Sequence, residues 1–163
     1  MLFGAKTSEQ AVSENQQDHV SGSSIRGTRR KGRELALQAL YQIEMTDDAS
    51  AAAVDLFLRH FEGNPGAKEF ARRLVSGVVS QRAAIDGLIE RCTENWKLTR
   101  LAKVELVILR MATYELVFCS DIPTSVSLDE AIEIGKRFGS ADSATFINGV
   151  LDQVAHSSDM KSD

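Results

Sequence analysis

Five cationic side chains crowd into eight residues near the N-terminus of the chain, and we call them the basic cluster. They are Arg26, Arg29, Arg30, Lys31 and Arg33. An apolar run with helical spacing follows, so the pattern places the cluster at the start of a helix. Exposed cations there oppose the helix dipole, at a cost of about 0.3 to 1 kcal/mol each. Bound phosphate would reverse this effect, because its oxygens accept from helix amides and guanidinium groups together.

A solvated basic turn is the alternative interpretation of the basic cluster, and charge alone does not decide between the two. At 100° per residue, Arg29 and Arg33 align with Ala36 and Leu40, so the cluster extends a buried stripe toward solvent. We expect replacement of Arg30 and Arg33 by Ala to weaken nucleic-acid binding and its salt dependence while leaving the fold intact.

A second feature is the apolar stretch FINGVL at residues 146–151. Gly149 inside a helix costs roughly 1 kcal/mol relative to Ala, so we expect a close contact there, most simply tight helix packing. Phe146 is most simply part of the core, although an aromatic at the edge of an apolar stripe also suits stacking on an unpaired base. Arg110, among apolar neighbours, is expected to form a structural ion pair or to clamp carbonyls.

The sequence contains no spacing typical of catalysis or of a metal site. GxGxxG, P-loop, HExxH and GxSxG patterns are missing, and His19, His60 and His156 stand far apart. The acidic residues between positions 129 and 133 share a helix with basic residues, which favours a solvated face over general acid–base chemistry. We expect a protein that is not an enzyme, with no catalytic residue, no metal and no cofactor.

Composition limits the partners and the compartment. The 163 residues are 43% apolar and carry a formal charge of −4, so affinity for nucleic acid must depend on where the cations sit. Cys92 and Cys119 are 27 positions apart without a CxxC motif, which predicts buried reduced thiols and a reducing cytoplasm. No signal peptide or membrane-length apolar run is present, so we expect a cytoplasmic protein that does not bind membranes.

The elements that position these residues are predicted to be helices. Residues 1–25 are polar and predict a disordered tail, and residues 157–163 a flexible C-terminal tail. Periodicity predicts helices from Thr28 to about residue 46, over 51–61, over 70–89 as one helix or two, over 101–118, over 122–138, and from Ser140 or Asp142 onward. The stretch 101–118 is apolar all round, which places it in the centre; a buried strand is its rival interpretation. Gly77 and Gly87 are predicted sites of close backbone approach.

Three blocks together resemble one family. They are RRKGRELALQALY at 29–41, VELVILRMATYEL at 104–116, and IP, EAIE, FG, Ser143 and FINGVL between positions 122 and 151. In order and spacing they are similar to the bacterial NusB transcription antitermination factors, from about Arg29 to Ala155. The resemblance implies an all-α fold of two three-helix bundles packed into one compact helical domain, here residues 26–156.

The resemblance also implies a non-catalytic RNA-binding role. NusB proteins pair with NusE, a small-subunit ribosomal protein, and bind the boxA element of ribosomal RNA leaders, joining RNA polymerase, NusA and NusG against premature termination. Carried over, the RNA-binding residues are Arg29, Arg30, Lys31, Arg33, Asp142 and Phe146. Tyr41 and Glu105 fall on positions that face NusE, and we expect Glu105→Lys to impair NusE pairing more than RNA contact. The oligomeric state stays open, including a homodimer that would bury the RNA face.

Two departures from the family pattern are Gly32, where alanine is common, and Leu106, where a basic residue is common. Gly32 is expected to loosen the first turn of its helix. Two other functions remain as alternatives. One is the NusB-like domain of an RNA cytosine methyltransferase, which the chain end at Asp163, without a methyl-donor site, argues against. The other is a protein-binding scaffold whose arginines hold an acidic partner.

Overall fold

Seven α-helices and one short 3₁₀ helix form the part of the chain that the structure describes, and no strand occurs there. The computed structural model describes residues 6–93 and 96–159, with side chains over 25–93 and 96–158. The helices are α1 (Lys6–Thr46), α2 (Ala51–Arg59), α3 (Pro65–Ser80), α4 (Arg82–Cys92), α5 (Lys103–Phe118), α6 (Thr124–Phe138) and α7 (Ser143–Asp159), with the 3₁₀ helix at Leu98–Arg100. The predicted all-α class is confirmed, and residues 101–118 are predominantly helix, not strand.

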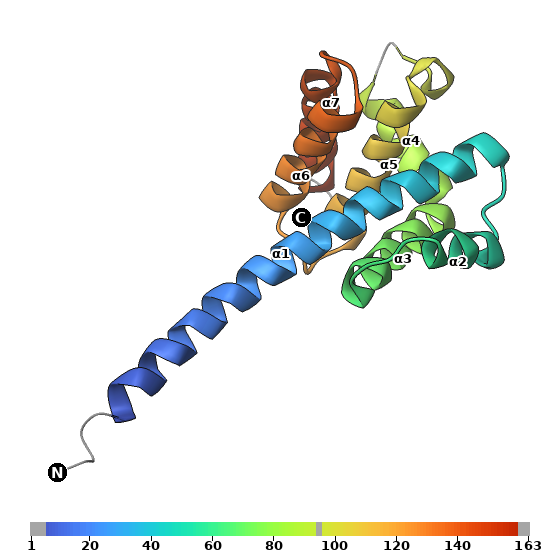
Figure 1. The fold of residues 1–163 in the computed structure, drawn as a ribbon. Helices are drawn as coiled ribbons and strands as arrows, with labels where there is room; N and C mark the ends of the chain where they lie inside the picture. The colour runs from blue at the N-terminus through green and yellow to red at the C-terminus, as the bar shows by residue number, and fades with distance from the viewer. Residues whose placement is uncertain (1–5, 94–95, 160–163) are drawn as a thin grey trace.

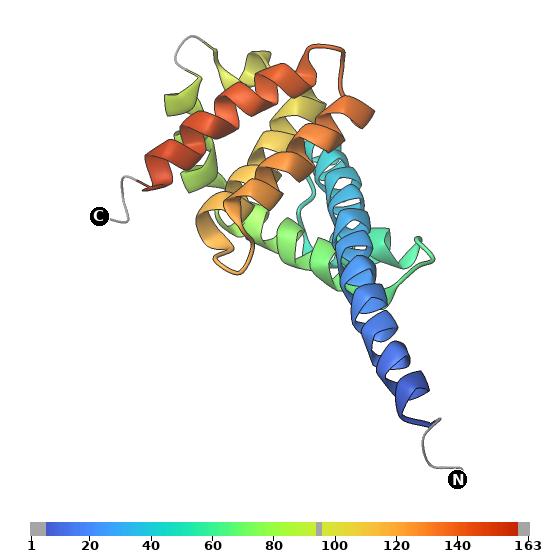
Figure 2. The ribbon, with the colours of Figure 1, turned by 90° about the vertical axis from the view of Figure 1, so that its left-hand side faces the viewer.

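Helix α5 is the centre of the fold, as its apolar sequence predicts. It packs against α1, α3, α4, α6 and α7, and Ile108 and Leu109 in its middle are fully buried. The C-terminal half of α1 packs with α2 and α3, while α5, α6 and α7 pack with one another and α4 lies against α5 and α7 (Figures 1 and 2). Within the two-bundle architecture, α5 is thus the helix that contacts helices of both bundles.

The first helix begins well before the expected start near Thr28. It runs from Lys6, and its N-terminal part projects away from the other helices (Figure 1). Extending a helix that is already nucleated fixes one residue per hydrogen bond, so polar residues can continue it without tertiary packing. The predicted disordered tail over 1–25 thus differs from the structure from Lys6 onward, while residues 1–5 lie outside the described part. At the other end α7 reaches Asp159, past the predicted tail start at 157, and 160–163 are not described.

Local capping explains the boundaries that the sequence predicts only roughly. Ser50 accepts from the Ala53 amide at the start of α2, and Asn64 accepts from the Gly66 amide at the start of α3. Pro65 occupies the first turn of α3, where its missing N–H costs nothing. Helix α3 therefore begins directly after Asn64, and the stretch predicted as one helix or two forms two, α3 and α4.

Two expectations about buried glycines change in the structure. A Cβ on Gly32 would lie 2.9 Å from the Ala67 carbonyl oxygen, so this glycine lets α1 and α3 approach closely instead of loosening α1. At Gly77 the close neighbour is the Tyr114 ring, and at Gly87 a Cβ would meet only the end of Arg91. The backbone approach predicted for Gly77 and Gly87 is therefore wrong at both positions.

Candidate nucleic-acid interface

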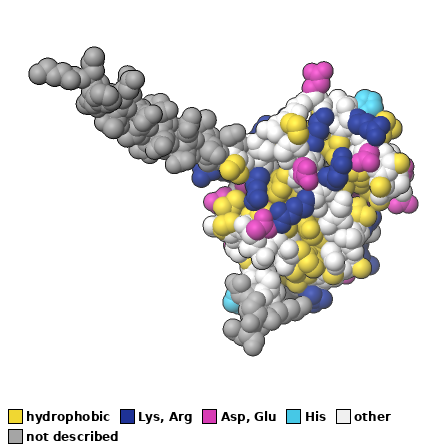
Figure 3. All heavy atoms as spheres, turned by 90° about the horizontal axis from the view of Figure 1, so that it is seen from below, with side chains coloured by type: hydrophobic (Ala, Val, Ile, Leu, Met, Phe, Trp, Pro, Cys, Tyr) yellow, Lys and Arg dark blue, Asp and Glu magenta, His cyan; other side chains and the backbone are white. Residues whose placement is uncertain are grey.

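The basic cluster divides into an exposed group and a buried residue. Arg30 and Lys31 have half or more of their side chains exposed, at 50% and 60%, and Arg29 is partly exposed. Arg26 is exposed as well. Figure 3 shows Lys and Arg side chains interspersed with acids on the face next to the emerging α1. Three of the four predicted cationic RNA contacts, Arg29, Arg30 and Lys31, are thus accessible to an outside anion.

Arg30 is held in place by α6 without being covered. Its Nε and Nη2 atoms donate to the two carboxylate oxygens of Glu130, at 3.1 and 3.0 Å. This hydrogen bonding raises the pKa of Arg30. Its Nη1 atom has no partner among the described side chains. A bidentate pair fixes the plane of the guanidinium group, so the remaining N–H donors point in a defined direction.

Arg33 is a correction to the predicted RNA contacts. Only 3% of its side chain is exposed, and its Nε and Nη2 donate to Glu115 of α5 at 3.0 and 2.7 Å. The Ser127 hydroxyl donates to the same carboxylate at 3.1 Å. Arg33 is buried and paired, so it cannot contact RNA at the surface without breaking its ion pair. Breaking that pair would leave the buried Glu115 carboxylate without a partner, which is costly. Its alignment with Ala36 and Leu40 in the sequence is the signal that indicates this burial.

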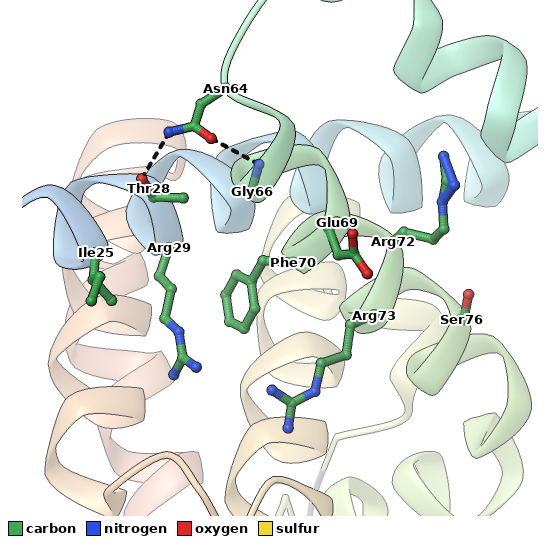
Figure 4. Close-up of a pocket in the computed structure, with 10 residues that line it drawn as sticks. All are labelled: Ile25, Thr28, Arg29, Asn64, Gly66, Glu69, Phe70, Arg72, Arg73 and Ser76. Atoms are coloured by element: carbon green, nitrogen blue, oxygen red, sulfur yellow. Dashed lines mark hydrogen bonds between the residues drawn. The ribbon is translucent and has the colours of Figure 1, made fainter.

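A groove of about 660 Å³ lies beside Arg29, between α1 and α3 (Figure 4). The Phe70 ring separates Arg29 from Arg73, and the Arg29 guanidinium sits 5.0 Å from the ring centroid. Arg73 and Arg29 both pair with Asp121, with Arg73 Nη1 donating at 3.0 Å. The hydrogen bonds from Arg73 lower the pKa of Asp121 to about 2. The sequence interpretation missed Arg72 and Arg73, although two adjacent arginines are a visible signal.

The two predicted RNA residues outside α1 lie where α6 turns into α7. Asp142 is exposed, and its carbonyl accepts from the Phe146 amide at 3.1 Å in the first turn of α7. Phe146 is half-buried against the core, as the core interpretation predicts in part, and its stacking on a base stays a prediction. This turn follows α6, which is joined to α1 by the Arg30–Glu130 and Arg137–Glu34 pairs. Helix α6 thus lies between the two: it pairs with α1 near the exposed cations, and the turn that carries Asp142 follows its C-terminal end.

The two predicted NusE-facing residues lie on neighbouring helices. Tyr41 on α1 is 38% exposed, and Glu105 in the first turn of α5 is half-buried. The Lys103–Glu44 pair, at 3.8 Å, joins the same parts of α5 and α1. Glu105 also accepts from the Ser143 hydroxyl at 2.7 Å. Glu105 therefore holds the start of α7, so Glu105→Lys would disturb the turn that carries Asp142, in addition to replacing the residue predicted to face NusE.

The structure also shows the surroundings of Arg110, of the two cysteines and of Leu106. Arg110 forms the expected ion pairs, donating to Asp86 and Glu44 at 2.8 Å each. Cys119 is buried, whereas Cys92 is only half-buried, and both are free thiols. Leu106 is a core residue. Over the described residues no group of three or more His, Cys, Asp or Glu side chains could hold a metal ion.

Gly149 does not have the close contact expected for it. A Cβ built on it meets nothing within 4 Å. It faces a hollow that the sequence interpretation missed, and the exposed Trp96 lines the same hollow. Among the helices that the structure describes, none is both long enough and apolar enough to cross a membrane.

Comparison with known proteins fits this arrangement. The sequence model of the NusB family matches residues 30–156. The chain belongs to the NusB family. A relative from Geobacter sulfurreducens, named transcription antitermination protein NusB, is 49% identical over 132 residues, covering 79% of this chain and 94% of that protein. The NusB relative from Desulfatibacillum aliphaticivorans is 46% identical over 128 residues, covering 78% and 90%.

Solved NusB structures share the fold. The structure of T. maritima NusB superposes with a TM-score of 0.72 at 42% identity and covers 78% of this chain and 90% of that one. A crystal structure of the antitermination factors NusB and NusE in complex with double-stranded RNA gives a TM-score of 0.73 at 24% identity, covering 80% and 97%. That second likeness shows the NusB fold alone. The family places this chain among the transcription antitermination proteins.

Proposed function

We propose that this NusB-family chain is a non-catalytic, cytoplasmic RNA-binding factor in transcription antitermination. Together with NusE it binds the boxA element of nascent ribosomal RNA, and the pair acts with NusA, NusG and RNA polymerase. The observation that carries the proposal is Arg30, whose guanidinium group is fixed by Glu130 yet half exposed, with Nη1 bonded to none of the described side chains. The complex of NusB and NusE with RNA, on the same fold, supports the partners.

The exposed cations suit the phosphates of the strand. Contacts to phosphates position a nucleic acid but do not read its sequence. Arg30 and Lys31 lie on one side of α1 with their charged ends in solvent, and Arg29 flanks them. Because the overall charge is −4, attraction for RNA depends on where the cations lie and not on the net charge. The strand therefore docks along the start of the packed part of α1 and α6.

The turn before α7 suits base recognition. A carboxylate such as Asp142 repels phosphate but accepts hydrogen bonds from the amino group of a base such as cytosine. The half-buried Phe146 offers a ring for stacking by an unpaired base. Tyr41 and Glu105 are the residues that we propose to face NusE. Because Glu105 also binds Ser143, occupancy by NusE and the position of Asp142 are mechanically linked.

The test measures binding to a boxA RNA and to a scrambled RNA, each with and without NusE. We expect tighter binding to boxA in the presence of NusE. For a single strand, log affinity falls against log salt with a slope of about 0.7 per neutralised phosphate, so Arg30→Ala lowers the slope by about 0.7. Arg59→Ala on α2, an exposed arginine away from α6 and α7, is the matched control and leaves the slope unchanged.

Equal affinity for boxA and scrambled RNA in the presence of NusE would reject specific recognition. An unchanged slope for Arg30→Ala would remove α1 from the RNA path. Size measurement of the free protein decides whether a homodimer forms, and loss of RNA binding on dimerisation would show that the dimer covers the RNA face.

A further inference from the structure

A hollow of about 430 Å³ lies between the C-terminal end of α4 and one side of α7, and neither α1 nor α3 lines it. Its lining includes Arg91, Thr93, Trp96, Phe146, Gly149 and Gln153. Trp96 is the single tryptophan of the chain and is 57% exposed. Exposure of so large an aromatic side chain beside a second aromatic ring is typical of a binding surface rather than of a core.

Gly149 of α7 and the backbone at the end of α4 form two sides of the hollow. Gly149 is an interior residue of α7, and a Cβ there would meet nothing within 4 Å, so internal packing does not require glycine. The backbone of Trp96 is fixed to the end of α4, because its amide donates to the Thr93 carbonyl at 2.6 Å. The Thr93 hydroxyl in turn donates to the Ile89 carbonyl at 3.0 Å. The backbone that carries Trp96 is therefore anchored to the end of α4.

The charge of the hollow differs from that of the groove beside Arg29. In that groove Arg29, Arg72 and Arg73 all pair with carboxylates, from Asp121 and Asp55. The lining residues that the structure describes include no carboxylate, and Arg91 forms no ion pair with another described residue. A cation and two aromatic rings that line one hollow together with neutral polar groups match one nucleotide, which has a flat base and an anionic phosphate.

The geometry points to the hollow as a nucleotide subsite for an unpaired base of the bound RNA, stacked on Trp96 with its phosphate on Arg91. Phe146 belongs both to the proposed RNA surface and to the hollow, so the strand passes from the Asp142 turn into the hollow without leaving the protein. Gly149 leaves the room that the base occupies, and Gln153 supplies an amide for its edge. This inference rests on the proposed function and extends its RNA path beyond Phe146.

Trp96 makes the test direct, because the tryptophan fluorescence of the chain comes from this residue alone. The full chain with NusE is titrated with boxA RNA while two signals are recorded. The anisotropy of labelled RNA reports total binding, and the emission of Trp96 reports the hollow. The NusE used contains no tryptophan, so it does not emit at the wavelength measured. We expect quenching of Trp96 with the same midpoint as the anisotropy change, since a base stacked on indole quenches it.

A size series at Gly149 provides the matched variants. Gly149→Ala and Gly149→Leu both replace glycine in a helix at a position with free space, so both are expected to fold with a melting temperature no lower than that of the parent. Alanine leaves most of the hollow open and keeps the quenching. Leucine fills it, and we expect loss of quenching and about tenfold weaker binding, the range expected for one lost base stack. Trp96→Ala should weaken binding similarly.

The outcomes separate the two proposals. RNA binding that depends on Arg30 but leaves Trp96 emission unchanged would overturn the subsite and leave the proposed function standing. No anisotropy change at all would overturn both. Equal affinity and equal quenching for Gly149→Ala and Gly149→Leu would show that quenching arises outside the hollow, which also overturns the subsite.

Discussion

Arg33 and Arg30 stand almost one turn apart on α1, and each makes a bidentate contact with a glutamate, yet the two regions around them differ in kind. Arg33 and Glu115 are nearly fully buried, with Ser127 completing the hydrogen bonds of the carboxylate. Arg30 pairs with Glu130, whose side chain is only 9% exposed, but half of the Arg30 side chain is in solvent. The same residue type in one basic run thus serves the core on one side of the helix and a ligand on the other.

The largest effect is expected at the buried pair. Arg33→Ala leaves Glu115 charged, buried and without its main partner, which costs about 3 to 5 kcal/mol of unfolding free energy. Urea denaturation of the two single variants measures this, and Arg30→Ala should lose less stability than Arg33→Ala, because half of the Arg30 side chain is already in solvent even though Glu130 is buried. The double variant Arg33→Met, Glu115→Leu should recover most of the loss. Equal losses for Arg30→Ala and Arg33→Ala would abolish the distinction between the two regions.

A smaller effect is expected at Gly32, which lies between the two arginines. Alanine there forces its Cβ against the Ala67 carbonyl and the Phe70 ring, so overpacking of about 1 to 3 kcal/mol outweighs a gain of about 1 kcal/mol in helix propensity. We expect a net loss of stability in thermal or urea unfolding. Gly87→Ala is the control, since the space there is free and the same propensity gain should raise stability. A stabilising Gly32→Ala would mean that α1 and α3 are not in close contact.

The smallest effect is a pH dependence on the exposed side. Arg73 lowers the pKa of Asp121 to about 2 in the folded protein, below its ordinary value of 3.8. A lowered folded pKa adds stability that is present above pH 3.8 and is lost as the pH falls toward 2. Because the pair is exposed, the change is small and is reduced by salt. Asp121→Asn should flatten this part of the acid unfolding curve, and identical acid limbs for both proteins would contradict the pairing.

Helix type and order were predictable because they depend on local signals. The apolar periodicity of residues 101–118, the capping residues Ser50 and Asn64 and the turn at 46–48 act within a few positions of themselves. The family resemblance, which the family comparison confirms, rests on blocks that lie within these elements. The start of α1 was less predictable, because a polar segment continues a nucleated helix without any apolar pattern.

The candidate site was predictable only in part. The accessible residues Arg29, Arg30 and Lys31 were found from their charge, and their role in RNA binding stays a prediction, as do the roles of Asp142, Phe146, Tyr41 and Glu105. The hollow beside Trp96 was missed because α4 and α7 are distant in the chain and no motif marks it. Gly149 stood out in the sequence, but there it predicted tight helix packing, and the structure shows that a Cβ on it would meet nothing within 4 Å.

The sequence by itself determined which segments become helices and where positive charge is concentrated, because both depend on residue type and on spacing within a few turns. Only the tertiary structure decided which cations are free. Glu115, Asp121 and Glu130 approach the basic cluster from 82 to 100 positions away in the chain. Whether an arginine holds the core or meets a ligand depends on how far these elements cover it: Arg33 and its carboxylate are both buried, whereas Arg30 keeps half of its side chain in solvent beside a buried carboxylate.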